Sequence, residues 1–143
     1  MKKVVIFFAI IVIFLSGIGY LYLVGKSNNN AINKHNIIFE NCYQREIYGS
    51  EVATIINKAI DSNEKNDIPK TQDGKYIEND TNSIKISIKM IDNDNIYTME
   101  AIYDNKISEF IKYYNQIKFK CTDIKYHKNT NMVKTLLFEQ VSV

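Results

Sequence analysis

The stretch Ile84-Lys85-Ile86-Ser87-Ile88-Lys89-Met90 alternates apolar and polar residues along its whole length. Successive side chains of a β-strand point to opposite faces, so a period of two predicts a strand with one buried and one solvated face. The polar cluster at 92–95 then predicts a turn, and 96–102 reads as the returning strand. These segments together predict an antiparallel hairpin.

The clearest helix precedes this hairpin. Its apolar residues recur at intervals of three and four and predict one buried face: Val52, Ile55, Ile56, Ala59 and Ile60. Ser50 is a good N-cap, and Glu51 lies where the helix dipole favours an acid. We expect the helix to fade near 61–63. A polar loop should occupy 61–82, with a short strand around 75–77, and a loop of this length is a candidate binding segment.

The segments farther from the hairpin complete the predicted domain. A semi-apolar stripe predicts a helix over 31–43, and Asp104 with Asn105 should cap a third helix. A second hairpin is predicted from 117–126 and 132–141. Helices packed on antiparallel β-hairpins make this an α+β domain.

The N-terminal region is apolar on every face. Val4 to Val24 is a run of 21 residues without a charge, and a helix of that length spans roughly 32 Å, close to the hydrocarbon thickness of a bilayer. Lys2 and Lys3 precede the run, which favours a cytoplasmic N-terminus. The predicted organisation is a cytoplasmic stub (1–3), a transmembrane helix (4–24), a linker (25–30) and an extracytoplasmic domain (31–143).

A cleaved signal peptide is the alternative for this region. Gly17 and Gly19 have the small side chains of a cleavage site. The apolar run continues to Val24, which is longer than a usual signal core, and this favours an anchor in the lipid bilayer. Both interpretations place the remaining chain outside the cell membrane.

The composition excludes some partners. The formal charge is +2 and 24% of residues are charged, without the concentrated basic excess of a nucleic-acid-binding protein. The abundance of asparagine, isoleucine and tyrosine is typical of an AT-rich bacterial genome, so single Lys and Asn residues carry little functional weight.

Cys42 and Cys121 are the only cysteines. An exported domain permits a disulfide between them, while burial as two separate apolar side chains is the alternative. A zinc site with His35 and His127 is disfavoured, because the Cys–His separations of seven and six residues match no usual ligand spacing. We therefore predict no metal site.

Catalytic and cofactor motifs are also missing from the sequence. The acidic segments 61–67 and 92–95 lack the glycine of a calcium loop. There is no phosphate-binding glycine loop and no G-x-S-x-G element. The pairing of Cys121 with His127 or His35 is the one candidate for nucleophilic chemistry, and nothing in the sequence activates the thiol. We expect a protein without enzymatic activity or cofactor.

Five lysines lie in the predicted strands: Lys85, Lys89, Lys118, Lys120 and Lys125. They would suit a basic face for cell-wall polymers or lipid headgroups. A solvated sheet face with edge lysines that oppose aggregation explains them equally simply, and the alternation favours that explanation.

The elements Asn36-Ile37-Ile38-Phe39-Glu40 and Gly49-Ser50-Glu51-Val52 carry a resemblance. This N-x-x-F-E and G-[S/T]-x-V pattern resembles a group of short bacterial proteins with one N-terminal membrane helix. The resemblance covers about residues 1–60 and implies a membrane anchor, but no functional residues.

The sequence therefore predicts a membrane-anchored binding or interaction domain, with a protein partner or self-association as its mode of action. One alternative is a structural subunit of a pilin-like assembly, although the glutamate five residues into a prepilin's apolar run has no counterpart before Val24. The other alternative is a cleaved secreted protein or a small surface enzyme.

Overall fold

The computed structural model describes residues 2–91 and 95–142, in two compact units, Met1–Lys34 and His35–Val143. The predicted turn at 92–95 falls largely outside the described residues. The elements are α1 (Lys2–Glu40), β1 (Glu46–Tyr48), α2 (Gly49–Lys65), β2 (Lys85–Lys89), β3 (Ile96–Thr98), α3 (Met99–Asp104), α4 (Ile107–Tyr114), β4 (Lys118–Tyr126) and β5 (Val133–Gln140).

The first unit consists of the N-terminal part of α1, and the side chains of this helix from Lys2 to Asn30 are all exposed. Among the described residues, α1 is the one helix long and apolar enough to span a membrane. The segment 25–30 was predicted to be a linker, but it is helical. Helix propagation is cooperative and this segment contains no proline, so its polar residues do not end the helix.

The second unit is built on one five-stranded sheet in the order β1-β4-β5-β2-β3. Both predicted hairpins are present, because β2 pairs with β3 and β4 pairs with β5 in antiparallel fashion. The α+β class is confirmed. The sheet is mixed rather than antiparallel throughout, because β2 and β5 join the hairpins as a parallel pair. This pairing aligns the buried Ile86 and Ile88 with Leu136 and Phe138.

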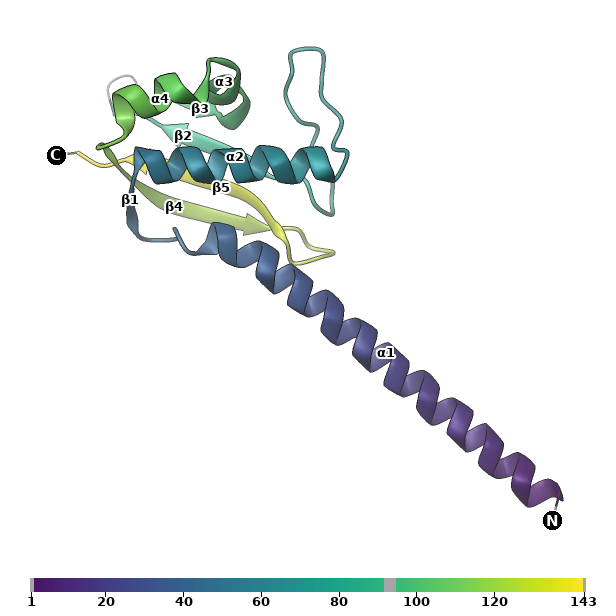
Figure 1. Cartoon of the computed structure of the whole chain (residues 1–143). Coiled ribbons are helices and arrows are strands. Elements are labelled where there is room, and N and C mark those ends of the chain that lie inside the picture. The colour runs from purple at the N-terminus through teal and green to yellow at the C-terminus, as the bar shows by residue number, and fades with distance from the viewer. Residues whose placement is uncertain (1, 92–94, 143) are drawn as a thin grey trace. The chain divides into compact units, whose positions relative to one another are not determined.

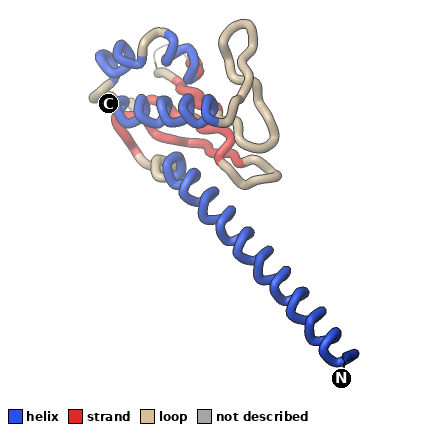
Figure 2. Tube along the Cα trace, turned by 45° about the vertical axis from the view of Figure 1, so that its right-hand side comes forward, coloured by secondary structure: helices blue, strands red, loops and turns tan. Residues whose placement is uncertain are grey.

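Helices α2, α3 and α4 lie on the same side of this sheet (Figures 1 and 2). The predicted apolar face of α2 is confirmed, since all five of its residues are buried in the core. The end of α1 lies beside α2, because His35 and Phe39 share a furrow with Lys58 and Asp61. Within the described part of the second unit, no helix covers the other face of the sheet (Figure 1).

Several boundaries differ from the predicted ones around α2. The helix begins at Gly49 rather than after a Ser50 cap, and the Tyr48 backbone N–H donates to the Glu51 carboxylate over 3.0 Å. It continues to Lys65 instead of fading near 61–63, because Asn63 is buried and hydrogen-bonded within the domain. Strand β1 was not predicted, since three residues are too short to show a period.

The segment after β3 also differs. The predicted returning strand ends at Thr98, whose side chain accepts a hydrogen bond from the Ala101 N–H and starts α3. Asn105 was expected to be the N-cap of the third helix, which corresponds to α4. It is instead the C-cap of α3, and Lys106 is the N-cap residue of α4. The predicted strand around 75–77 is a single bridge between Lys70 and Tyr76.

Candidate binding site beside the 66–84 loop

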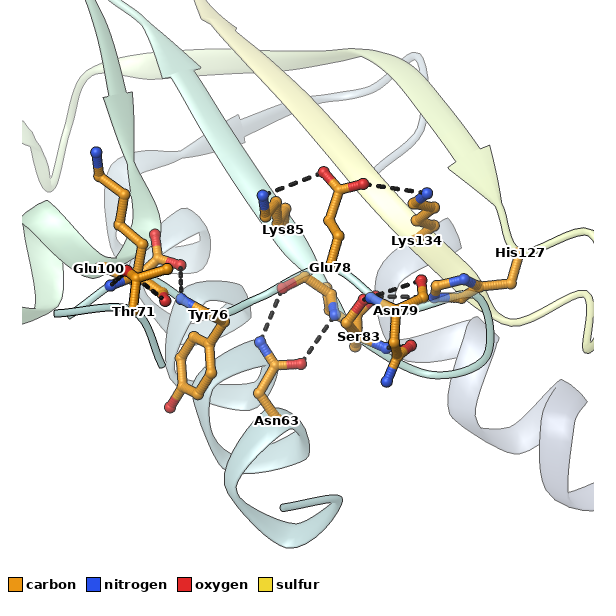
Figure 3. A network of polar contacts seen from close by, with 12 residues as sticks. Asn63, Thr71, Tyr76, Glu78, Asn79, Ser83, Lys85, Glu100, His127 and Lys134 are labelled. Carbon is orange, nitrogen blue, oxygen red and sulfur yellow. Dashed lines mark hydrogen bonds and ion pairs between the residues drawn. The ribbon is translucent and has the colours of Figure 1, made fainter. Parts of the chain in front are cut away.

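The loop between α2 and β2, residues 66–84, is held by a buried amide at its end. Asn63 lies in the last turns of α2 with 0% of its surface exposed. Its Nδ2 donates to the Ile84 carbonyl over 2.8 Å, and its Oδ1 accepts from the Ile84 N–H over 2.8 Å (Figure 3). This two-point clamp fixes where the loop enters β2.

Asn79 organises the turn that precedes the clamp. Its Oδ1 accepts hydrogen bonds from the backbone N–H groups of Thr81, Asn82 and Ser83, at 3.0, 2.9 and 3.0 Å. Its own N–H donates to Ser83 Oγ over 2.9 Å. An asparagine that bonds to the following backbone in this way stabilises a turn without regular secondary structure.

His127 ties this turn to the connection between β4 and β5. Its Nε2 lies 2.8 Å from the Ser83 carbonyl (Figure 3). A carbonyl only accepts, so Nε2 carries the proton. The ring is 1% exposed, and its Nδ1 has no hydrogen-bond partner within the described part of the chain. Thr130 Oγ1 adds a second tie by donating to the Thr81 carbonyl over 2.6 Å.

Glu78 joins the loop to two strands. Its carboxylate lies between the ammonium groups of Lys85 on β2 and Lys134 on β5, at 3.1 Å from each (Figure 3). These two lysines lower the pKa of Glu78, Lys85 having the larger effect. The carboxylate is therefore ionised at neutral pH and crosses over the parallel strand pair.

A polar cavity of about 630 Å³ opens where these groups meet. Its lining residues carry both charges and neutral hydrogen-bonding groups: Glu78, Asp80, Lys125, Tyr126, His127, Lys128, Asn129, Lys134 and Thr135. This set offers ammonium groups to an anion and carboxylates to hydroxyl, amide or ammonium donors.

Tyr126 is the aromatic wall of the cavity. Its hydroxyl donates to Glu40 Oε1, at the end of α1, over 3.0 Å. Burial, helped by this acceptor, raises the pKa of Tyr126 to about 12. The phenol therefore stays protonated and presents its ring to the cavity.

The five strand lysines lie on the helix-free face of the sheet. The register places Lys85 opposite Thr135, and Lys89 opposite Glu139, while the core-facing positions of β2 are isoleucines. Acidic partners neutralise much of this face: Lys118 bonds to Glu46 at 3.0 Å. Lys125 pairs with Asp123 at 3.6 Å, Lys85 and Lys134 pair with Glu78, and the register places Lys120 opposite Glu139. The face is a mixed-charge surface rather than a strongly basic one.

The structure brings Cys42 and Cys121 together as buried free thiols. The histidines lie elsewhere: His127 bonds to Ser83, and His35 packs on the Phe39 ring with centroids 5.3 Å apart. Within residues 2–91 and 95–142, no group of three His, Cys, Asp or Glu side chains could hold a metal ion.

Sequence reasoning missed the residues that build this site. Nothing in the sequence distinguished Asn63, Glu78 and Asn79 from the other polar residues of their segment. Hydrogen bonds between distant groups leave no periodic pattern in the sequence. The one clue in the sequence was Asn79 followed by Ser83, because asparagine often starts a turn by bonding to the backbone that follows it. Lys85, Lys125 and the candidate binding loop were singled out from the sequence, but Lys134 and the contact of the loop with Lys85 were not.

A cavity of about 730 Å³ lies at the β1 end of the sheet, where Glu46 and Lys118 already pair with each other. The 630 Å³ cavity is lined instead by Glu78 and Asp80 of the loop together with the buried His127, which makes it the better candidate site. Comparisons with protein-family models, curated proteins and solved structures find no match to this chain.

Proposed function

We propose that this protein is a membrane-anchored extracytoplasmic binding domain without catalytic activity. One observation carries the proposal: the buried Asn63 of α2 and the buried His127 after β4 hold the 66–84 loop, and Lys134 of β5 pairs with its Glu78, which lines a polar cavity. A protein rarely buries polar groups to hold a loop unless the loop's position matters, because each such group costs free energy if left unpaired.

The lining residues define the ligand's chemistry. Lys125 and Lys128 would hold an anionic group at the rim, while Glu78 and Asp80 would accept hydrogen bonds from hydroxyl or amide groups. Cell-wall glycopeptides combine carboxylates, hydroxyls and amides in this way. A membrane tether would keep the domain at the surface where such polymers are found.

The charges around the apolar segment support the proposed location. Lys2 and Lys3 precede residues 4–24, while Lys26 alone follows closely. The positive-inside bias then favours an external domain. A C-terminal tag should be digested by protease added to intact cells while the full-length chain stays in the membrane fraction. A protected tag would contradict the orientation, and a shortened, soluble chain would indicate cleavage.

Binding should be tested with the full chain in lipid nanodiscs and purified cell-wall fragments as the probe. We expect the double variant Lys125→Gln/Lys128→Gln to sediment with the wall at least several-fold less than the natural protein. The charge-matched control is Lys58→Gln/Lys112→Gln, which changes exposed lysines of α2 and α4. Equal loss of wall binding in both variants would show non-specific charge attraction. No loss of wall binding in either variant would exclude the cavity as the binding site.

A further inference from the structure

Cys42 and Cys121 are 79 residues apart in the sequence and meet in the core of the domain. Tyr43, the neighbour of Cys42, forms an isolated parallel bridge with Cys121. The Gln44 N–H also donates to the Cys121 carbonyl over 2.9 Å. The backbone just after α1 is thus docked on β4 at the position of the second cysteine.

This docking gives a spacing suitable for a covalent bond. Bridge partners lie roughly 5 Å apart and consecutive Cα atoms about 3.8 Å, so the two cysteine Cα atoms lie within about 9 Å of each other, and about 6 Å apart where the two directions are perpendicular. Disulfides have Cα separations of about 4.4–6.8 Å. Each thiol donates to a nearby backbone carbonyl, Cys42 to Phe39 over 2.9 Å and Cys121 to Asp123 over 3.7 Å, and the neighbouring Cys121 side chain lowers the pKa of Cys42.

We propose that Cys42 and Cys121 form an intramolecular disulfide that fastens the end of α1 to β4. The proposal rests on the extracytoplasmic location inferred above, because disulfides persist outside the reducing cytoplasm. The cross-link would join the part of the domain nearest the apolar helix to a central strand of the sheet.

The first thiol to react is Cys42. It lines a furrow of about 220 Å³ with Arg45 and Glu51, whereas Cys121 is 0% exposed and does not line this furrow. Cys42, itself 3% exposed, is therefore the nearer of the two thiols to the surface, and the Cys121 side chain, with a smaller effect of the Arg45 guanidinium, lowers its pKa.

The oxidant is the disulfide of a dithiol carrier outside the membrane. The Cys42 thiolate attacks one carrier sulfur, forming a mixed disulfide and releasing the other carrier sulfur as a thiolate. The Cys121 sulfur then attacks Cys42 and displaces the carrier. Two protein thiols become one disulfide, the carrier disulfide becomes two thiols, and the two protein protons pass to the carrier.

The first test is independent of location. The purified full chain in detergent is equilibrated in buffers of oxidised and reduced glutathione, then denatured and treated with a thiol-reactive polymer label. We expect zero labels in oxidising buffer and two after reduction, with the chain remaining monomeric. Two labels, a glutathione adduct or a covalent dimer in oxidising buffer would overturn the proposal.

Serine variants verify the pairing. Cys42→Ser and Cys121→Ser should each take one label in oxidising buffer, while the double variant takes none. We also expect reduction to lower the unfolding temperature of the natural chain and leave that of the double variant unchanged. A decrease of equal size in both would show that the reductant acts elsewhere.

The second test examines the cell. Labelling after rapid acid quenching of intact cells should find the cysteines oxidised and the C-terminal tag accessible to protease. An accessible tag with two free thiols would contradict the disulfide in the cell while leaving the location intact. A protected tag would contradict the location, and the glutathione experiment would still decide whether the pair forms a disulfide.

Discussion

Asn63 is the residue on which the loop's position depends most directly, because its side chain satisfies both backbone groups of Ile84. We expect Asn63→Ala to lower the free energy of unfolding by about 2–4 kcal/mol, since two buried groups lose their partners. Asn66→Ala is the matched control, because its exposed amide bonds only to Ser62. That variant should lose less than about 1 kcal/mol in urea unfolding. Similar losses in both would show that burial of Asn63 adds nothing.

His35 makes the stability of the domain depend on pH. Burial lowers the pKa of His35 below 6.5, so the unfolded chain binds a proton more readily than the folded one. The free energy of unfolding is therefore unaffected by His35 above 6.5 and falls as the pH drops through 6.5 toward the folded-state pKa.

The comparison of His35→Gln with the natural chain isolates this contribution. We expect the difference in unfolding temperature between about pH 7.5 and about pH 5.5 to be smaller in the variant. An unchanged pH dependence would mean that His35 does not titrate differently in the folded state.

At the scale of elements, α2 and α4 are held close by a glycine. A Cβ at Gly49 would collide with the Tyr114 carbonyl at the end of α4, while the Gly49 N–H donates to Ile117 over 2.9 Å. We expect Gly49→Ala to destabilise the domain by about 1–3 kcal/mol, because backbone atoms must move apart. The neighbouring, exposed Ser50→Ala should change the unfolding free energy by less than about 0.5 kcal/mol. Thermal unfolding of the two variants tests this, and equal stability would contradict the close packing.

The elements that the sequence predicted are those with a repeated pattern. The buried face of α2 and the alternation of β2 were recognisable because each extends over several periods of its own structure. By contrast, β1 has three residues and α3 six, too few to show a period. The end of α2 was misplaced for another reason: Asn63 is a poor helix former, yet tertiary hydrogen bonds keep it helical.

At the scale of the whole molecule, the apolar half of α1 should decide where the protein resides. We expect Ile13→Lys, at the middle of the 4–24 segment, to shift protein out of the carbonate-resistant membrane fraction, since a central lysine costs about 2.5–3.5 kcal/mol in insertion. Asn29→Lys is the control, because it adds the same charge beyond the apolar run. Equal membrane retention of both variants would contradict the anchor.

The sequence by itself determined the properties that depend on neighbouring residues. These are the apolar run of 4–24, the amphipathic face of α2, the strand alternation and the α+β class, because periodicity and length are local features of the chain. It also identified Cys42 and Cys121 as a pair to consider.

Only the tertiary structure decided which distant groups meet. The parallel pairing of β2 with β5 placed Glu78 between Lys85 and Lys134. The bridge between the backbone after α1 and strand β4 brought Cys42 close to Cys121. Such contacts depend on strand register and on the closure of long chain segments, and these are chosen by the packing of the complete core.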